Sequence, residues 1–138
     1  MEIKLDLKNN AYHFVAENES GNEVNIDASP AIGGQGKGAR PMELLIMGLG
    51  GCSGIDVLSI LRKQKIEPRE FHIKINADRE KDVTPSLFTD IHLTFQFKGN
   101  VDPDKAKRAI DLSLDKYCSA AKTLEKTAKI TYDYTIEA

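Results

Sequence analysis

The sequence of 138 residues has little of several residue types on which common functional sites depend. It contains no tryptophan and only three histidines, His13, His72 and His92. No two of these histidines stand at the spacing of metal ligands, so we expect no metal site from them and no bound cofactor. The 19 basic and 21 acidic residues give a net charge of −2, which offers no basic surface for nucleic acid.

The beginning of the chain also lacks the pattern of a signal peptide. Charged and apolar residues alternate from Glu2 onwards, so we expect a cytoplasmic protein. The length, without repeats or a linker, predicts a single domain over residues 1–138. Only two cysteines are present, 66 positions apart, and in the cytoplasm they are more typical of free thiols or a redox pair than of a structural disulfide.

The most apolar stretch of the chain, residues 44–61, carries a single charge, Asp56, and contains Cys52. We predict a helix from Pro41, which suits a first turn, to Lys63, whose charge suits a last turn. A helix this apolar is expected to be buried nearly all round. It is long enough to cross a membrane, but its carboxylate, its two serines and its glycines are costly or poor there, so we expect no membrane span.

Four glycines, Gly48, Gly50, Gly51 and Gly54, lie close together in this predicted helix. Each costs a helix interior roughly 1 kcal/mol relative to alanine, which requires a compensating reason. One reason is close approach of another helix, from the same chain or from a partner subunit. The alternative is a local break at Gly50 and Gly51, which would place Cys52 near a new helix N-terminus that favours thiolate.

Elsewhere, alternation of apolar and polar residues predicts strands at 3–7, 12–16, 24–26, 71–75, 91–97 and 130–136. Asp102 as N-cap and Pro103 after it predict a second helix to about residue 117, followed by a short one at 119–126. The glycine-rich loop at 28–39 lacks the spacing of a phosphate-binding motif. This order predicts an α+β fold with a largely antiparallel sheet packed on the long central helix.

The two cysteines are the main candidates for chemistry. Cys52 lies in the middle of the central helix and Cys118 lies at the junction of two predicted helices, so they form either a redox pair or two packed thiols. Asp56 follows Cys52 by one helical turn, and its carboxylate disfavours thiolate.

An arginine is therefore expected to stabilise the thiolate of Cys52. Arg40 and Arg79 are the two candidates that lie in predicted loops, because guanidinium suits both a thiolate and a peroxide oxygen. Glu43 either orients such an arginine or interacts with the helix N-terminus.

Residues 41–45 (PMELL) followed by 48–52 (GLGGC) resemble the central-helix motif of the OsmC/organic-hydroperoxide-resistance (Ohr) superfamily. Residues 112–119 are similar to the second-cysteine region of that family, and the likeness covers essentially the whole chain. The branch with Gly-Gly-Cys followed by Ile-Asp-Val, here residues 55–57, is the most similar. The catalytic glutamate of the family's peroxidases directly follows the proline, where this sequence has Met42, and Glu43 comes one position later.

The resemblance implies an OsmC-like, intertwined homodimer with active sites at the subunit interface. It also implies that Cys52 attacks an organic hydroperoxide and becomes a sulfenic acid, which Cys118 captures as a disulfide that an external dithiol reduces. Arg40 and Glu43 are the expected further catalytic residues. Two alternatives remain, a non-catalytic dimeric protein that binds a small hydrophobic ligand and a disulfide-based redox sensor.

Overall fold

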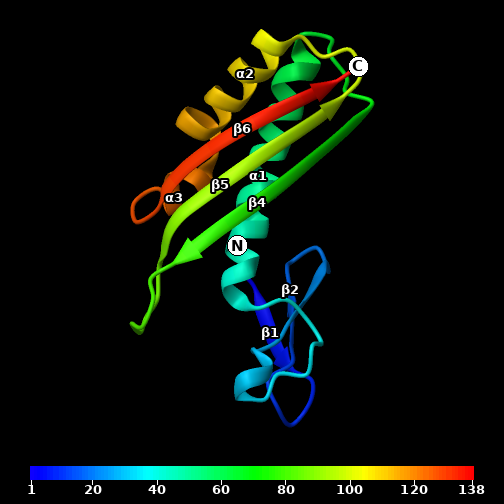
Figure 1. Cartoon of the computed structure of the whole chain (residues 1–138). Coiled ribbons are helices and arrows are strands. Elements are labelled where there is room, and N and C mark those ends of the chain that lie inside the picture. The colour runs from blue at the N-terminus through cyan, green and yellow to red at the C-terminus, as the bar shows by residue number, and fades with distance from the viewer. The chain divides into compact units, whose positions relative to one another are not determined.

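Strands and helices follow one another in the order that the sequence predicts, which confirms the α+β fold. The computed structural model describes residues 1–138 and is drawn in Figure 1. Its elements are β1 (Lys4–Leu7), β2 (Phe14–Glu17), β3 (Glu23–Ile26), the 3₁₀ turn η1 (Pro30–Ile32), α1 (Pro41–Lys63), β4 (Glu70–Arg79), β5 (Phe88–Lys98), α2 (Pro103–Leu112), the π-helical turn η2 (Ser113–Tyr117), α3 (Ser119–Leu124) and β6 (Lys129–Glu137).

The chain forms two compact units, Met1–Leu45 and Ile46–Ala138. The expectation of a single domain stays a prediction. Each unit holds one three-stranded sheet, in the order β1-β2-β3 and β4-β5-β6. Pairing is antiparallel in the first sheet and between β4 and β5, whereas β5 and β6 run parallel. The predicted, largely antiparallel character is therefore confirmed.

In the first unit, a buried carboxylate organises the glycine-rich loop. The oxygens of Asp27 accept hydrogen bonds from the backbone N–H groups of Ala28, Gln35 and Lys37, at 2.7 to 3.0 Å. These bonds, that of Lys37 above all, hold the pKa of the Asp27 carboxyl below its ordinary value although burial opposes them. The loop is thus tied to the end of β3 by one side chain.

The glycines of this loop are explained by close packing of the backbone. A Cβ atom added at Gly34 would lie 1.8 Å from the carbonyl oxygen of Ala28, and one at Gly38 would lie 2.4 Å from the backbone of Asn25. Only glycine fits at such distances. By contrast, the apolar side chains of β1 lack cover in the chain, and Leu5 and Leu7 are each about half exposed.

In the second unit, one face of the sheet is apolar and the helices cover it. The inward residues of β5, among them Leu93, Phe95 and Phe97, are at most 1% exposed. Helix α1 lies across this sheet (Figure 1). Helix α2 covers the same face at β6, where the hydroxyl of Tyr132 donates to Asp111. This two-layer packing forms the main core of the molecule.

Helix α1 begins and ends at the predicted residues and is continuous, so the alternative of a break at Gly50 and Gly51 is wrong. Close approach to the sheet explains two of the glycines. A Cβ at Gly50 would lie 3.1 Å from Ile75 Cδ1, and one at Gly54 would lie 3.0 Å from Ile73 Cδ1. A Cβ at Gly48 or Gly51 would meet nothing within 4 Å.

Burial of α1 within the chain is restricted to one face. Leu49, Val57 and Leu61 are at most 1% exposed, whereas Met47 and Ile55 are 57% and 71% exposed. By length and composition α1 is also apolar enough to cross a membrane, but core helices of soluble proteins have the same property. One face of α1 packs on the sheet, and the other face is exposed in this chain.

Candidate functional site

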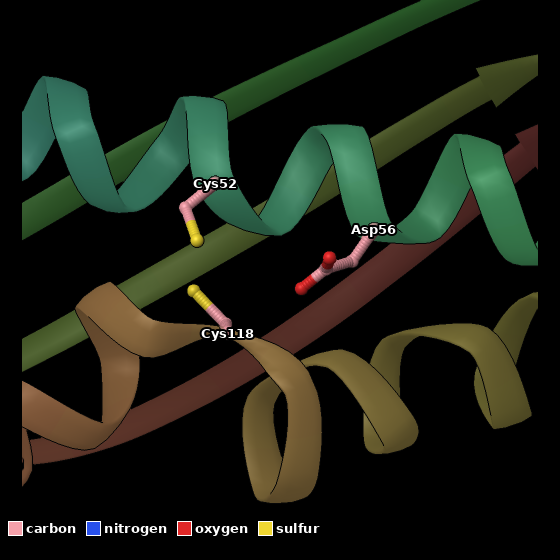
Figure 2. A group of neighbouring side chains, drawn as sticks. All are labelled: Cys52, Asp56 and Cys118. Atoms are coloured by element: carbon pink, nitrogen blue, oxygen red, sulfur yellow. The ribbon is translucent and has the colours of Figure 1, made fainter.

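The second unit brings three reactive side chains into one cluster. The sulfur atoms of Cys52 and Cys118 and a carboxylate oxygen of Asp56 all lie within 4.8 Å of one another. Figure 2 shows the two sulfur atoms facing each other, with the carboxylate pointing into the same space. Both cysteines are free thiols. Residues 66 positions apart in the sequence thus meet across the core.

Helix α1 supplies two members of this cluster. Cys52 and Asp56 are four positions apart, so they lie on one face of the helix in successive turns (Figure 2). Cys52 is neither fully exposed nor fully buried. The helix that carries it is fixed by the packing of Leu49, Gly50 and Gly54 on the core.

Cys118 follows a π-helical turn and does not lie within a regular α-helix. Its N–H donates to the carbonyl of Ser113 at 2.7 Å, the five-residue spacing of the π-helical turn η2. The sequence predicts an α-helix to about residue 117. The helical segment does reach that residue, but its last five residues form a π-helical turn and not an α-helix. The chain is extended at Cys118 (φ −77°, ψ 106°), and the sulfur accepts the N–H of Ala121 at 3.3 Å. This turn aims the thiol at α1.

Cys118 is fully buried, and burial is the main reason why the pKa of its thiol rises from 9.0 to about 11. The N–H of Ala121 opposes this rise, whereas the thiol of Cys52 and the carboxylate of Asp56 add to it. Cys118 is therefore a neutral thiol at physiological pH. As such it can donate its proton to the sulfur of Cys52, which is the more accessible of the two.

A pair of serines completes the cluster, and the sequence analysis did not identify them. Ser113 Oγ lies 3.1 Å from Asp56 Oδ2 and 3.2 Å from Ser53 Oγ, and both serines are fully buried. Because a carboxylate only accepts, Ser113 donates to Asp56. The bond fixes the orientation of the carboxylate. The sequence signal was two polar residues on helix faces that are otherwise apolar.

The other predicted site residues make local contacts. Glu43 accepts the backbone N–H of Arg40 at 2.8 Å, which caps the start of α1. Both residues belong to the first unit, and their catalytic roles stay predictions. In the second unit, Arg79 donates to the carbonyl of Ser86 at 3.0 and 3.3 Å and lies over the ring of Phe88. That contact closes the loop between β4 and β5.

The fold and this cluster together define a structural class, the α+β proteins in which a thiol on a long helix faces a thiol from a neighbouring turn. The chain matches the family model described as OsmC-like protein over residues 34–133. It therefore belongs to the OsmC family, as the motif on α1 indicated. Family membership favours a soluble protein, in keeping with the packing of α1.

Named and solved relatives agree with this assignment. Protein YhfA of Escherichia coli (strain K12) is 41% identical over 126 residues, which cover 91% of this chain and 90% of YhfA. A hypothetical protein from Aquifex aeolicus VF5 is 29% identical with a TM-score of 0.81, over 99% of this chain and 97% of that one. The organic hydroperoxide resistance protein OhrB of Bacillus subtilis shares the fold, with 17% identity and a TM-score of 0.69 over 97% and 96% of the two chains.

Proposed function

We propose that this protein is a thiol-dependent peroxidase that reduces organic hydroperoxides. The observation that carries the proposal is the pair of facing thiols, one accessible and one buried, on the two sides of the cluster. The fold shared with OhrB of Bacillus subtilis, whose name refers to organic hydroperoxide resistance, adds support. In this reading the protein defends the cell against oxidative damage in the cytoplasm.

The reaction follows from the different environments of the thiols. The thiolate of Cys52 attacks the outer oxygen of the hydroperoxide, the O–O bond breaks, and the alcohol leaves with the proton that the thiol has lost. Cys52 is now a sulfenic acid. The sulfur of Cys118 attacks the sulfur of Cys52, and its proton leaves with the hydroxyl group as water. An external dithiol then reduces the disulfide and restores both thiols.

Buried Cys118 suits the second step better than the first. Its raised pKa keeps it protonated while Cys52 waits for peroxide, so the two thiols do not compete for the oxidant. Asp56 faces both thiols. An ionised carboxylate accepts hydrogen bonds and has no proton to donate. Arg40 is proposed to polarise the peroxide oxygen, and Glu43 to orient Arg40. Arg40→Ala and Glu43→Gln test this, since a lower rate with an intact fold would assign them to catalysis.

The reduction of cumene hydroperoxide, followed by stopped flow, tests the activity. Wild type is expected to consume peroxide with a dithiol present, and Cys52→Ser, which lacks the nucleophile, is expected to show no turnover above the uncatalysed reaction. Wild type as slow as Cys52→Ser would contradict the proposal. An unreactive Cys52 together with a bound apolar molecule, detected by mass spectrometry of gently purified protein, would favour the ligand-binding alternative.

We also propose that the protein works as an intertwined homodimer. The face of α1 that the chain leaves exposed is apolar at Met47 and Ile55 and is open at Gly48 and Gly51. A shallow groove continues this face along Ile55, Leu58, Ser59, Arg62 and Lys63. Small residues four or fewer positions apart allow helices to approach closely, so a second copy of α1 fits this surface. The half-exposed leucines of β1 also need cover.

Sedimentation equilibrium tests the dimer. Ile55→Lys places a charge on the exposed face of α1 and is expected to shift the protein towards the monomer. Val83→Lys is the control, because Val83 is also an exposed β-branched residue (51%, against 71% for Ile55) and lies in the loop between β4 and β5. A wild-type protein that is monomeric at micromolar concentration would contradict the proposal.

A further inference from the structure

The cluster of Cys52, Cys118 and Asp56 also has the composition of a metal site. Two thiols and a carboxylate are the kinds of ligand that zinc takes in proteins, whereas magnesium and calcium prefer oxygen alone. Cys52 and Asp56 are separated by four positions on α1 and Cys118 faces them from the turn after η2, so the three donors converge from two elements (Figure 2).

The distances are close to those that a tetrahedral site requires. Zinc–sulfur bonds of about 2.3 Å and zinc–oxygen bonds of about 2.1 Å place the ligand atoms roughly 3.5 to 3.8 Å apart. In the structure the three donor atoms all lie within 4.8 Å of one another. A contraction of about 1.3 Å at most, which side-chain rotation can supply, would bring them into coordination.

The negative charge of the three ligands and the hydrogen bonds that orient them favour a cation at this site. Two thiolates and a carboxylate carry three negative charges in a partly buried space, and a divalent cation leaves a net charge of −1. Ser113 Oγ donates to Asp56 Oδ2 at 3.1 Å, which is the kind of outer contact that orients a metal ligand. The N–H of Ala121 does the same for the sulfur of Cys118 at 3.3 Å.

We propose that the reduced protein binds one Zn²⁺ per chain through the sulfur atoms of Cys52 and Cys118 and the carboxylate of Asp56. Binding releases the two thiol protons and changes no oxidation state. Three protein ligands leave a fourth position for water. Because the metal and the disulfide use the same sulfur atoms, each excludes the other, and oxidation of the thiols expels the ion. The sequence analysis considered only histidine spacing and did not predict this site.

Cobalt(II) is the probe for this site, because it takes the same ligands as zinc and absorbs light. Reduced full-length protein is titrated with Co²⁺ without oxygen, and thiolate-to-cobalt charge-transfer bands together with intense tetrahedral ligand-field bands are expected at one equivalent. Zn²⁺ added afterwards should remove both sets of bands, and Mg²⁺ should not. Absence of the bands, or bands that Zn²⁺ leaves unchanged, would overturn the proposal.

Variants test two of the three ligands and the outer contact of Asp56. Cys118→Ser and Asp56→Asn should each weaken cobalt binding strongly, and Ser113→Ala should weaken it by about tenfold through the outer contact. Asp115→Asn, which removes an exposed carboxylate from η2, is the matched control and should bind like wild type. If Asp56→Asn and Asp115→Asn bind equally well, the three-ligand site is wrong.

The metal proposal and the peroxidase proposal fail independently. Cobalt bands do not require peroxide turnover, and turnover by metal-free protein does not require the bands. Circular dichroism of each variant shows whether it is folded before its titration is interpreted. A folded Cys118→Ser variant that retains the full charge-transfer intensity of wild type would overturn the two-thiolate site even if the protein remains an active peroxidase.

Discussion

The two sides of the thiol cluster are built in different ways. On one side α1 is a regular helix of 23 residues that holds Cys52 at a partly accessible position. On the other side a π-helical turn and an extended residue bury Cys118 completely. The same kind of side chain thus has two environments, one partly accessible and one fully buried. The backbone around each thiol, rather than the thiol itself, sets this difference.

The comparison also concerns how each side is held in place. Helix α1 is fixed by apolar packing, with Leu49 and Val57 buried and Gly54 against Ile73 of β4. The turn at residues 113–121 is fixed by hydrogen bonds, from Cys118 N–H to Ser113 and from Ala121 N–H to Cys118. Removal of one polar group changes the apolar packing of a helix little. The same removal in a hydrogen-bonded turn leaves a partner group without its hydrogen bond. The predictions below test this difference.

The largest expected effect comes from replacing each of the two cysteines with serine in turn. Cys52→Ser removes the attacking sulfur, so neither a sulfenic acid nor peroxide turnover is expected. Cys118→Ser leaves the attack intact, and Cys52 should accumulate as a sulfenic acid after one equivalent of cumene hydroperoxide. A sulfenic-acid-specific probe such as dimedone, followed by mass spectrometry, measures this species. Sulfenic acid at Cys118 in the Cys52→Ser variant would reverse the proposed roles.

The raised pKa of Cys118 predicts a pH dependence of stability. The folded chain holds the thiol proton more tightly than the unfolded chain, so the stabilisation is complete below pH 9 and is lost as pH rises towards 11. The free energy of unfolding of the reduced protein should fall by up to about 3 kcal/mol more in wild type than in Cys118→Ala over this range.

Urea unfolding under reducing conditions at a series of alkaline pH values measures this difference. Cys52→Ala is the control and should keep most of the pH dependence, because burial is the main cause of the raised pKa of Cys118. Equal pH dependence in wild type and Cys118→Ala would show that the buried thiol is not responsible.

A smaller effect is expected from the buried serine on the hydrogen-bonded side. Ser113→Ala removes the donor to Asp56 Oδ2 and should lower the free energy of unfolding by about 1.5 kcal/mol. Ser20→Ala, which changes an exposed serine in the loop between β2 and β3, is the control and should change it by less than about 0.5 kcal/mol. Thermal or urea unfolding of the two variants decides the point, and equal losses would show that the bond from Ser113 to Asp56 does not stabilise the turn.

The regular parts of the site could be predicted from the sequence. Pro41 and the charges of Arg62 and Lys63 mark the ends of α1, and the structure has those ends. The N-cap Asp102 is confirmed as well, since its side chain accepts the N–H of Lys105 at 3.0 Å. These features depend on neighbours in the sequence, which the pattern of residue types reports directly.

The parts that depend on tertiary contacts could not be predicted from local patterns. The convergence of Cys52 and Cys118 requires the packing of α1 and the turn after α2 on one sheet, and only the family resemblance implied it. Asp56 was interpreted only as a charge that disfavours thiolate, because its bond to Ser113 joins residues 57 positions apart. The role of Asp27 in the glycine-rich loop was missed for the same reason, since its partners extend to Lys37.

The central claim is that Cys52 and Cys118 act as one redox pair within a chain. The direct test adds one equivalent of cumene hydroperoxide to fully reduced protein and maps the products by non-reducing peptide mass spectrometry. The account predicts a single cross-linked peptide pair that joins Cys52 to Cys118, with both free thiols lost at the same rate and restored by a dithiol. Two thiols that remain free, or a disulfide that joins Cys52 of one chain to Cys52 of another, would contradict it.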